Sequence, residues 1–448
     1  MGADRNRRRP GNQRPRTQRE MKKPSREKPR PAGLFFLCGG GKPQLAEISR
    51  TIRATIAARI VPWLARRVPV LIIKSELTAR SVARPGVPIL MVHRPTAFYN
   101  RLATAGLDGF CESYQAGDWD ADNLLLLLTK LLECSGGAAW AGGRSLRRYL
   151  GKPLPDSSED IIEHVRQNVS YHYDISNDFF ACFLDETMTY SAALFEEDAD
   201  GQPVAGAELL LDAQSRKIDR LLDLTAVGEG TRLLGIGTGW GYLAVLAAQR
   251  GAHVRTATLS AEQAKYAQHR VTGAGVGDRV AVELRDFREL GGDTETYDAV
   301  ISMGMVEAIG DRRWPACFSL LDQVLADGGR VGLQVMTMRH DRFLSARRRQ
   351  TWINKHVLPG FLMPSVPALD TAASRHSALK VLDSKAFGLH FAATLRIWRE
   401  RFEAQARQIE LLGFDDAFQR TWRFFLASSE ASFQTGLCDV YQYILARD

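Results

Sequence analysis

The sequence predicts an α/β protein with a mostly parallel sheet of seven strands, preceded by a smaller N-terminal domain of α/β or α+β type. Two observations predict the sheet. After Ala213, short apolar segments alternate with stretches of helical periodicity, which is the pattern of a parallel sheet whose strands are joined by helices. Directly after the first apolar segment comes a glycine-rich turn, Gly235 to Gly241, of the kind that lets a ligand approach the backbone closely.

Each expected strand is a short run rich in apolar residues and bounded by turn-forming or polar residues. Five such runs come first, and two more come late in the chain. An aromatic-rich helical region, residues 395–433, lies between the two late runs. Two segments, about 340–365 and 390–435, are expected to form helical lid insertions. The seven expected strands are residues 232–236, 253–259, 280–285, 299–303, 330–336, 379–384 and 439–446.

Residues 1–33 predict a disordered basic tail. The first 30 residues carry 12 Lys or Arg against 3 Asp or Glu, so the other 418 residues sum to about −1 although the whole chain carries +8. A nucleic-acid function inferred from this charge would rest on the tail alone, and we expect no nucleic-acid partner. The tail is equally suited to anionic lipid, or it has no function.

Residues 34–150 predict an N-terminal accessory domain, and residues 151–448 predict the main domain. Isoleucines at every fourth position from Ile48 to Ile60 indicate an amphipathic basic helix over residues 44–66. Packing of its apolar stripe onto its own domain is favoured over a role at a membrane surface. A Gly- and Pro-rich stretch marks the domain boundary. The other elements expected here are strands 70–73 and 89–92 and helices around 94–104 and 121–134.

The composition excludes several classes of protein. No apolar run approaches the roughly 20 residues that cross a bilayer, and no segment has the character of a secretory signal. The six cysteines are scattered, with no CxxC pair. They predict reduced thiols in a cytoplasmic protein, and neither disulfides nor a zinc site.

The glycine-rich turn alone also fits dinucleotide-binding proteins, so its surroundings decide. A dinucleotide site requires a carboxylate at the tip of the second strand, where this chain has Thr258 followed by Leu-Ser-Ala-Glu-Gln. The fourth strand runs into a segment around Glu307 that a nucleotide oxidoreductase does not require. Ahead of the sheet, residues 172–191 are dense in polar and aromatic side chains without a helical or strand period. This segment is predicted to cover a site.

With these segments the chain resembles the cyclopropane-fatty-acyl-phospholipid synthase family, closest to its actinobacterial branch of tuberculostearic acid methyltransferases. The resemblance runs from about residue 90 to the end. Its motifs, in chain order, are GFCESY at 109–114, the 172–191 segment, the glycine-rich turn, TLSAEQ at 258–263, MVEA at 305–308, WINK at 352–355, WRERF at 398–402 and DVYQ at 439–442.

The resemblance implies a class I, Rossmann-like methyltransferase. It would transfer a methyl group from S-adenosylmethionine to a double bond in an unsaturated acyl chain of a membrane phospholipid. Its product would be a cyclopropane or a methyl- or methylene-branched chain. Because an alkene is a poor nucleophile, positive charge develops on the acyl chain, and a dry cavity with aromatic faces would stabilise it. Aromatic candidates are Trp398, Phe402, Trp422, Phe424 and Phe425.

The same resemblance implies the site residues. Proton removal from the methylated chain needs a base, which in this family is thought to be a bound bicarbonate. Glu307 matches the carboxylate that helps hold the bicarbonate, Gln334 stands where many members have a histidine, and His390 is a further polar candidate. No metal is expected. By the family's pattern the cofactor site would include Tyr190, Ser191, Gly237, Gly239, Thr258, Gln263 and Asp286.

Three further positions depart from the family's pattern. Gly235 stands where a carboxylate normally accepts hydrogen bonds from the ribose, a loss of roughly 10- to 150-fold in affinity. Ala192 and Phe391 stand where the family has a cysteine and a tyrosine, so the bicarbonate ligand set is incomplete. Gln334 is shared with the actinobacterial branch. Restoring Gly235→Glu, Ala192→Cys and Phe391→Tyr is expected to raise turnover.

Two functions of different classes follow from these residues. The first is a methyltransferase of unsaturated phospholipid acyl chains, working as a homodimer at the inner face of the plasma membrane. The alternative is a catalytically degenerate homologue that binds lipid or an active paralogue. The departures at Gly235, Ala192 and Phe391 favour the alternative, whereas the intact glycine-rich turn and Glu307 favour the enzyme.

Overall fold

The computed structural model describes residues 70–73, 84–136, 175–292 and 294–448. All of them belong to one of the two units into which the chain divides, Glu47–Asp448. The expected basic tail, the helix over residues 44–66, the domain boundary and the first residues of the 172–191 segment lie outside the described residues. In the described part of the chain, no helix has the length and apolar character needed to cross a membrane.

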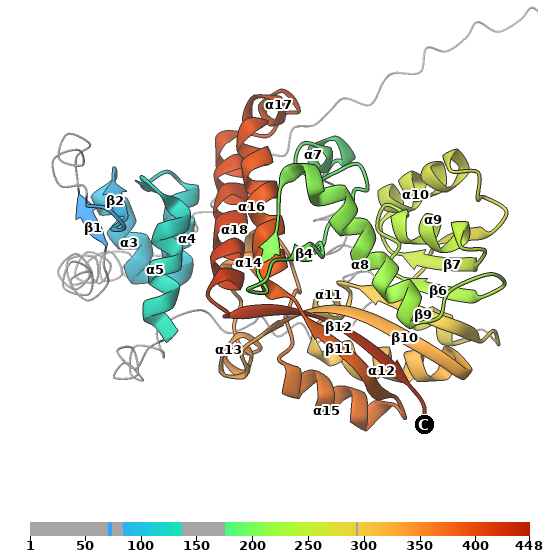
Figure 1. Ribbon diagram of the computed structural model, residues 1–448. Coiled ribbons are helices and arrows are strands. Elements are labelled where there is room, and N and C mark those ends of the chain that lie inside the picture. Colours follow the sequence, from blue (N-terminus) through green and yellow to red (C-terminus); the bar gives the residue numbers. More distant parts are fainter. Residues whose placement is uncertain (1–69, 74–83, 137–174, 293) are drawn as a thin grey trace, which may run out of the picture. The chain divides into compact units, whose positions relative to one another are not determined.

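A seven-stranded sheet has the order β11-β12-β10-β9-β6-β7-β8 (Figure 1). The five strands β10, β9, β6, β7 and β8 are parallel to one another. β12 runs antiparallel to both of its neighbours, β10 and β11. This inserted strand distinguishes the sheet from the 3-2-1-4-5-6 order of dinucleotide-binding folds. The strands are β6 (Arg232–Ile236), β7 (His253–Thr258), β8 (Val280–Leu284), β9 (Tyr297–Met303), β10 (Leu325–Met338), β11 (Lys380–Ala386) and β12 (Cys438–Ala446).

The observed strand ends agree with the expected ones to within two residues, with one exception. β10 begins at Leu325, five residues before the expected start at residue 330. Its pairing with β9 shifts register between Leu325 and Arg330, where Gly328 has a φ of 75°. The apolar pattern did not predict this part of the strand, because a bulge at the glycines interrupts the pattern.

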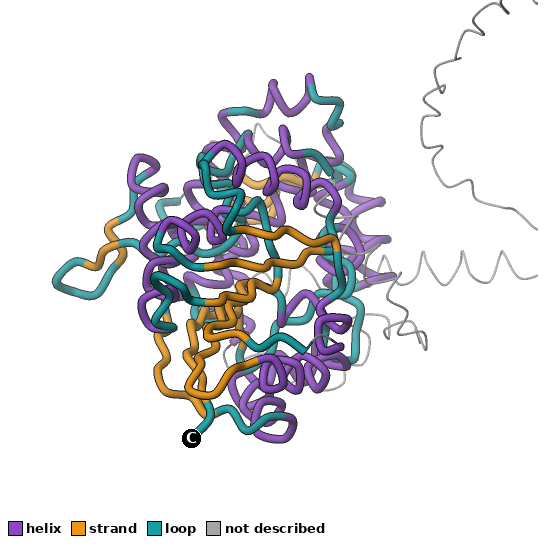
Figure 2. Tube along the Cα trace, turned by 90° about the vertical axis from the view of Figure 1, so that its right-hand side faces the viewer, coloured by secondary structure: helices purple, strands orange, loops and turns teal. Residues whose placement is uncertain are grey.

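Side chains alternate between the two faces of the sheet, and helices cover both. Leu233 and Ile301 pack with α8, α9 and α10 on one face. Leu234 and Val300 pack with α12 and α15 on the other. Figure 2 shows the strands (orange) among these helices (purple). The covering helices are α8 (Leu210–Leu224), α9 (Tyr242–Gln249), α10 (Ala261–Gly273), α12 (Trp314–Val324) and α15 (Val366–His376).

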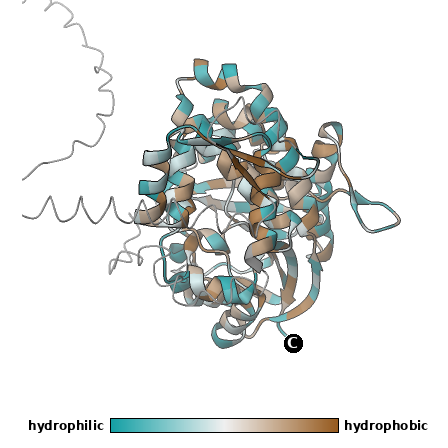
Figure 3. Ribbon diagram, turned by 90° about the vertical axis from the view of Figure 1, so that its left-hand side faces the viewer, coloured by the Kyte–Doolittle hydropathy of each residue, from teal (hydrophilic) through white to brown (hydrophobic). Residues whose placement is uncertain are grey.

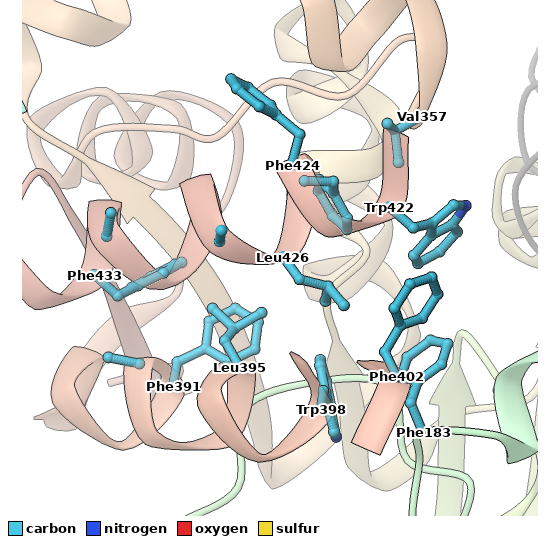
Figure 4. Packing of buried hydrophobic residues seen from close by; sticks show 14 of the residues in the cluster. Phe183, Val357, Phe391, Leu395, Trp398, Phe402, Trp422, Phe424, Leu426 and Phe433 are labelled. Atoms are coloured by element: carbon cyan, nitrogen blue, oxygen red, sulfur yellow. The ribbon is translucent and has the colours of Figure 1, made fainter. Parts of the chain in front are cut away.

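The aromatic-rich region expected over residues 395–433 begins earlier and forms three helices. They are α16 (Gly388–Ala404), α17 (Ala406–Leu411) and α18 (Asp416–Gln434). Asp415 caps α18 by accepting a hydrogen bond from the Phe418 N–H at 2.8 Å. α16 and α18 lie side by side, and Phe391 of α16 contacts Phe433 of α18 between them (Figures 1 and 4).

Shorter elements connect these layers. The helices are α7 (Asn177–Ala181), α11 (Val306–Ile309), α13 (His340–Ala346) and α14 (Trp352–His356). β4 (Glu196–Glu197) and β5 (Pro203–Val204) pair as a two-stranded ribbon, and short 3₁₀ helices cover Ala207–Leu209, Phe287–Gly292 and Asp311–Arg313.

The N-terminal elements form a small mixed sheet with helices. β1 (Leu71–Ile73) is parallel to β2 (Ile89–Val92), which is antiparallel to β3 (Trp119–Ala121). β2 is hydrophobic throughout (Figure 3). The helix expected from residue 121 begins only at Leu124, because Asn123 accepts a hydrogen bond from the Leu126 N–H at 2.9 Å and so starts the helix there. The helices are α3 (Pro95–Ala105), α4 (Leu107–Gln115) and α5 (Leu124–Gly136).

Arg420 of α18 ties these N-terminal elements to the aromatic helices. Its guanidinium lies 4.2 Å from the centre of the Tyr114 ring and donates to the Tyr114 and Trp119 carbonyls at 2.7 and 2.9 Å. It also forms a forked ion pair with Asp120, at 2.9 and 3.2 Å. A planar guanidinium suits this combination of stacking and forked bonding.

We expect Arg420→Met to lower the free energy of unfolding by about 1–2 kcal/mol, because several charge-assisted hydrogen bonds are lost while Asp120 stays partly solvated. Urea denaturation followed by tryptophan fluorescence would measure it. Arg423→Met is the matched control on the same helix. Since Arg423 pairs with the half-exposed Glu403, its loss should cost less than about 1 kcal/mol. Equal effects of the two changes would contradict the role given to Arg420.

Candidate active site

The carboxyl ends of β6, β7 and β8 meet at one edge of the sheet, where the glycine-rich turn lies. Gly237 and Gly239 have φ values of 93° and 54°, which disfavour residues with a side chain. A Cβ placed at either position would meet no heavy atom within 4 Å, so open space borders the backbone. The Gly237 N–H donates to the Ala257 carbonyl at 2.9 Å and holds the turn against β7. This cradle fits a nucleoside-bearing cofactor.

The end of β7 carries the next two predicted cofactor residues. Ser260 caps α10 by accepting from the Gln263 N–H at 3.1 Å. This places Gln263 where its Oε1 accepts a hydrogen bond from Thr258 Oγ1 at 3.0 Å. Both side chains are buried. The structure therefore brings Thr258 and Gln263 together at the end of β7, the strand to which Gly237 of the glycine-rich turn is hydrogen-bonded.

Asp286 follows β8 and is also buried at this edge. Its carboxylate is bound within its own loop: Oδ1 accepts from the backbone N–H and Nε of Arg288, both at 2.9 Å, and Oδ2 accepts from Nη2 at 3.0 Å. The predicted contact of Asp286 with the cofactor stays a prediction, since its oxygens already have these partners.

A cavity opens beside β9 and β10, and we call it the central cavity. Four predicted residues line it, Tyr190, Ser191, Glu307 and Gln334. Ala192 and Phe391, two of the departures from the family pattern, line it too. The remaining wall is largely apolar and comes in good part from the expected lid segments, with Ile353, Leu358, Phe361, Met363, Leu395, Trp398, Phe425 and Phe433.

Glu307 is the one carboxylic acid among the described residues that line the central cavity. It sits on the short helix after β9 and is fully buried. Its Oε1 accepts a hydrogen bond from the Met336 N–H at 3.2 Å, whereas its Oε2 has no partner. Burial raises the pKa of Glu307 to about 7, although the backbone hydrogen bonds oppose the rise. A buried acid with a free oxygen and this pKa is suited to exchange a proton near neutral pH.

Gln334 is held from behind by a buried network. Its Oε1 accepts from Gln442 Nε2 at 3.1 Å, and the same nitrogen donates to the Lys217 carbonyl at 2.9 Å. Arg220 Nη1 in turn donates to Gln442 Oε1 at 3.0 Å. Gln334 thus lines the cavity, and its side-chain oxygen is already hydrogen-bonded to Gln442.

His390 is not among the residues that line the central cavity, so its predicted role in the site stays a prediction. Its Nδ1 accepts a hydrogen bond from the Phe195 N–H at 3.1 Å, and its Nε2 lies 3.3 Å from a Glu197 oxygen. Successive residues of a helix point about 100° apart. With Phe391 facing the cavity, His390 faces the β4 segment.

Two of the five aromatic candidates line the central cavity, Trp398 and Phe425. The Trp398 ring stacks on Tyr190 with centroids 5.2 Å apart. Phe402 and Trp422 pack inside the aromatic core around Phe183 (Figure 4). Phe424 instead contacts Tyr114 at 5.4 Å, on the N-terminal side.

Sequence reasoning missed Lys217 and Gln214, which lie behind Ser191. Gln214 Nε2 donates to the carbonyls of Thr189 and Ser191, both at 3.1 Å, and Lys217 Nζ donates to Ser191 Oγ at 2.6 Å. Both residues lie on the buried face of α8, among Leu210, Ala213 and Leu221. Two polar residues on an apolar helix face were the signal that could have revealed them.

Thr256 occupies the space beside Gly235. The two residues are paired on neighbouring strands, and a Cβ at position 235 would lie 2.8 Å from Thr256 Oγ1. That hydroxyl is buried and bonded to Thr238 Oγ1 at 2.9 Å. The Thr256 side chain therefore occupies the space that a side chain at position 235 would need.

The sheet with its inserted antiparallel strand, the open glycine-rich turn and the cavity beyond β9 define a class I methyltransferase. The model of the family described as mycolic acid cyclopropane synthetase matches residues 162–443, and the chain belongs to this family.

The names of similar proteins are consistent with this family. The tuberculostearic acid methyltransferase of Mycobacterium tuberculosis is 43% identical over 418 residues, which is 91% of this chain and 95% of the relative. The cyclopropane-fatty-acyl-phospholipid synthase of Escherichia coli is 28% identical over 364 residues, 78% of this chain and 86% of the relative. Among solved structures, mycolic acid cyclopropane synthase CmaA1 complexed with SAH and CTAB has a TM-score of 0.55 at 29% identity, covering 62% of this chain and 97% of that one.

The contact between Gly235 and Thr256 bears on Gly235→Glu, one of the three changes that together are expected to raise turnover. We expect this single change to destabilise the protein by about 1–3 kcal/mol, because it overpacks a buried strand pair. The double change Gly235→Glu with Thr256→Gly should relieve the clash and tighten S-adenosylmethionine binding by roughly 10-fold or more. Urea denaturation and calorimetry would measure the two effects, with Thr256→Gly as control. Tighter binding by the single variant would contradict this account.

Proposed function

We propose that the protein transfers the methyl group of S-adenosylmethionine to a double bond in an unsaturated acyl chain of a membrane phospholipid. The central cavity is the observation that carries this proposal. Its wall is largely apolar, as an acyl chain requires, and it is lined by Glu307, whose Oε2 has no hydrogen-bond partner. Relatives named as a fatty-acyl-phospholipid synthase and a tuberculostearic acid methyltransferase support the substrate class.

The cofactor fits the residues at the edge of the sheet. Gly237 and Gly239 leave the backbone open to it, and Thr258, Gln263 and Tyr190 are the side chains proposed to hold it. When bound, S-adenosylmethionine supplies a methyl group on a positively charged sulfur, which an alkene can attack.

The aromatic wall serves the charge that develops on the acyl chain. Addition of a methyl group to one alkene carbon would leave a positive charge on the neighbouring chain carbon. Trp398, stacked on Tyr190, presents an electron-rich face to the cavity. The tight packing of α16 on α18 excludes water that would otherwise capture this carbon.

Glu307 is the group proposed to take up the proton that must then leave. Loss of a proton from the transferred methyl group closes a cyclopropane, and loss from an adjacent carbon gives a branched alkene. The free Oε2 accepts it in either case. The cavity provides little for a bound bicarbonate beside Glu307: the side chains of Ala192 and Phe391 form no hydrogen bond, and among the described residues that line it there is no Lys, Arg or His.

Because the proposed substrate is an acyl chain of a membrane phospholipid, we propose that the protein acts at a membrane surface, at the inner face of the plasma membrane. The homodimer expected from the family resemblance belongs to the same proposal. Co-sedimentation with lipid vesicles and mass photometry of the purified protein would check these two points.

The function is tested by calorimetric titration with S-adenosylmethionine, followed by incubation of the protein with the methyl-labelled cofactor and dioleoyl phospholipid vesicles. We expect binding and labelled lipid. Vesicles of saturated dipalmitoyl phospholipid are the control and should stay unlabelled. Cofactor binding without labelled oleoyl lipid would reject the enzyme and favour the lipid-binding homologue. The absence of binding would reject the cofactor as well.

Glu307→Gln should lower the rate of methyl transfer at least about 100-fold, because the amide cannot take up the proton. In the unchanged protein the rate should rise about tenfold per pH unit below pH 7 and level off above it, since Glu307 acts in its ionised form and its pKa is about 7. Glu400→Gln, an exposed carboxylate paired only with Arg396 in the described structure, should keep the original rate and profile. In carbon-dioxide-free buffer, a requirement for added bicarbonate would overturn Glu307 as the direct acceptor.

A further inference from the structure

Lys217 is a buried cation that none of the roles described above uses. It lies on the apolar face of α8, and its side chain has no solvent exposure. Removing an ammonium from water is costly unless another group compensates. Among the described residues, no carboxylate lies within ion-pair distance of Nζ, and the one hydrogen bond that Nζ makes there is to Ser191 Oγ, at 2.6 Å. A charge kept at such a cost points to a role in binding or catalysis.

Ser191 carries the effect of Lys217 into the central cavity. Its hydroxyl oxygen accepts the proton of Lys217, so its own O–H is left to donate elsewhere. Ser191 lines the cavity between Tyr190 and Ala192. Its backbone is fixed because Gln214 binds the carbonyls on either side of Tyr190. The geometry thus presents a hydroxyl donor, backed by a positive charge, to whatever occupies that side of the cavity.

The partner of this donor must be an anion or a strong acceptor. Burial lowers the pKa of Lys217 to about 7, and the negative charge of Asp185 opposes the lowering. An anionic ligand at Ser191 would favour the charged lysine further. The acyl chain carries no such group near its double bond. The sulfonium and the amino group of the cofactor are positive and would be repelled. A bicarbonate would lack side-chain donors at Ala192 and Phe391. The cofactor's carboxylate remains as the partner.

We propose that Lys217 is a positioning residue that, through Ser191, binds the carboxylate of the amino-acid end of S-adenosylmethionine. This inference rests on the proposed function only in taking S-adenosylmethionine as the cofactor. It explains why a chain without a carboxylate at position 235 can hold the cofactor: part of the affinity comes from its other end. It also gives the two buried ionisable groups different roles: Lys217 helps to bind the cofactor, and Glu307 accepts the proton from the acyl chain.

The test compares S-adenosylmethionine with decarboxylated S-adenosylmethionine, which keeps the sulfonium and the amine but lacks the carboxylate. Calorimetry would measure both affinities for the unchanged protein, Lys217→Met and Ser191→Ala. We expect each variant to bind S-adenosylmethionine roughly 10- to 150-fold more weakly, as for loss of a charge-assisted hydrogen bond. The affinity for the decarboxylated form should change less than about threefold in Ser191→Ala, and should stay the same or increase in Lys217→Met, because a repelling charge is removed.

Arg216→Gln is the matched control. It removes one positive charge from the same helix, but Arg216 binds the Leu194 carbonyl and Glu196 away from the central cavity. The ratio of the two affinities should be unchanged in this variant. Thermal unfolding of each variant would verify that it folds. If Lys217→Met does not fold, Ser191→Ala carries the same comparison.

Equal weakening of both ligands by Lys217→Met would show a merely structural role and overturn the proposal. Unchanged affinities with slower methyl transfer would also overturn it, because the charge would then act on the reacting centre. If the unchanged protein binds neither ligand, the proposed function fails first, and the assignment of Lys217 to the cofactor fails with it. Binding of the unchanged protein to both ligands with equal affinity would overturn the assignment of Lys217 alone.

Discussion

The packing of α16 against α18 is the contact on which the site depends. Aromatic side chains from these helices form one continuous buried cluster with Phe179, Phe180 and Phe183 from the α7 region. Figure 4 shows Phe183 beside Phe402 and Trp422 in this cluster. Edge-to-face contacts with centroids 4.7–6.3 Å apart recur through it. Such a layer excludes water from the carboxyl edge of the strands, and every polar group beneath it must find its partner within the protein or on a ligand.

Exclusion of water makes ordinary side chains reactive. Glu307 and Lys217 carry opposite charges in water, yet burial moves the pKa of each to about 7. The shifts run in opposite directions for one reason: a low-dielectric environment disfavours whichever form is charged. The apolar substitutions Ala192 and Phe391 extend this environment. Their side chains offer no hydrogen bond in the cavity that Glu307 lines with the unpartnered oxygen on which the proposed proton transfer relies.

Position 235 shows how a departure from a family pattern is compensated by a neighbour. As a single residue, Gly235 indicates a lost function. With Thr256 opposite it on β7, the pair is a repacked contact whose hydroxyl bonds to Thr238 in the glycine-rich turn. Coupled substitutions of this kind do not contribute independently, so the effect of one cannot be inferred without the other.

The sequence by itself determined the order of the strands along the chain, the glycine-rich turn and the family, because strand periodicity, glycine conformation and ordered motifs are local properties of the chain. It also identified Tyr190, Ser191, Glu307 and Gln334, which the structure brings together at one cavity. Only the tertiary structure decided that His390 faces Glu197, that Lys217 stands behind Ser191 and that Thr256 fills the room beside Gly235. These facts depend on which residues far apart in the chain share a contact. Local pattern carries no record of that, because any buried neighbour of suitable size satisfies the same periodicity.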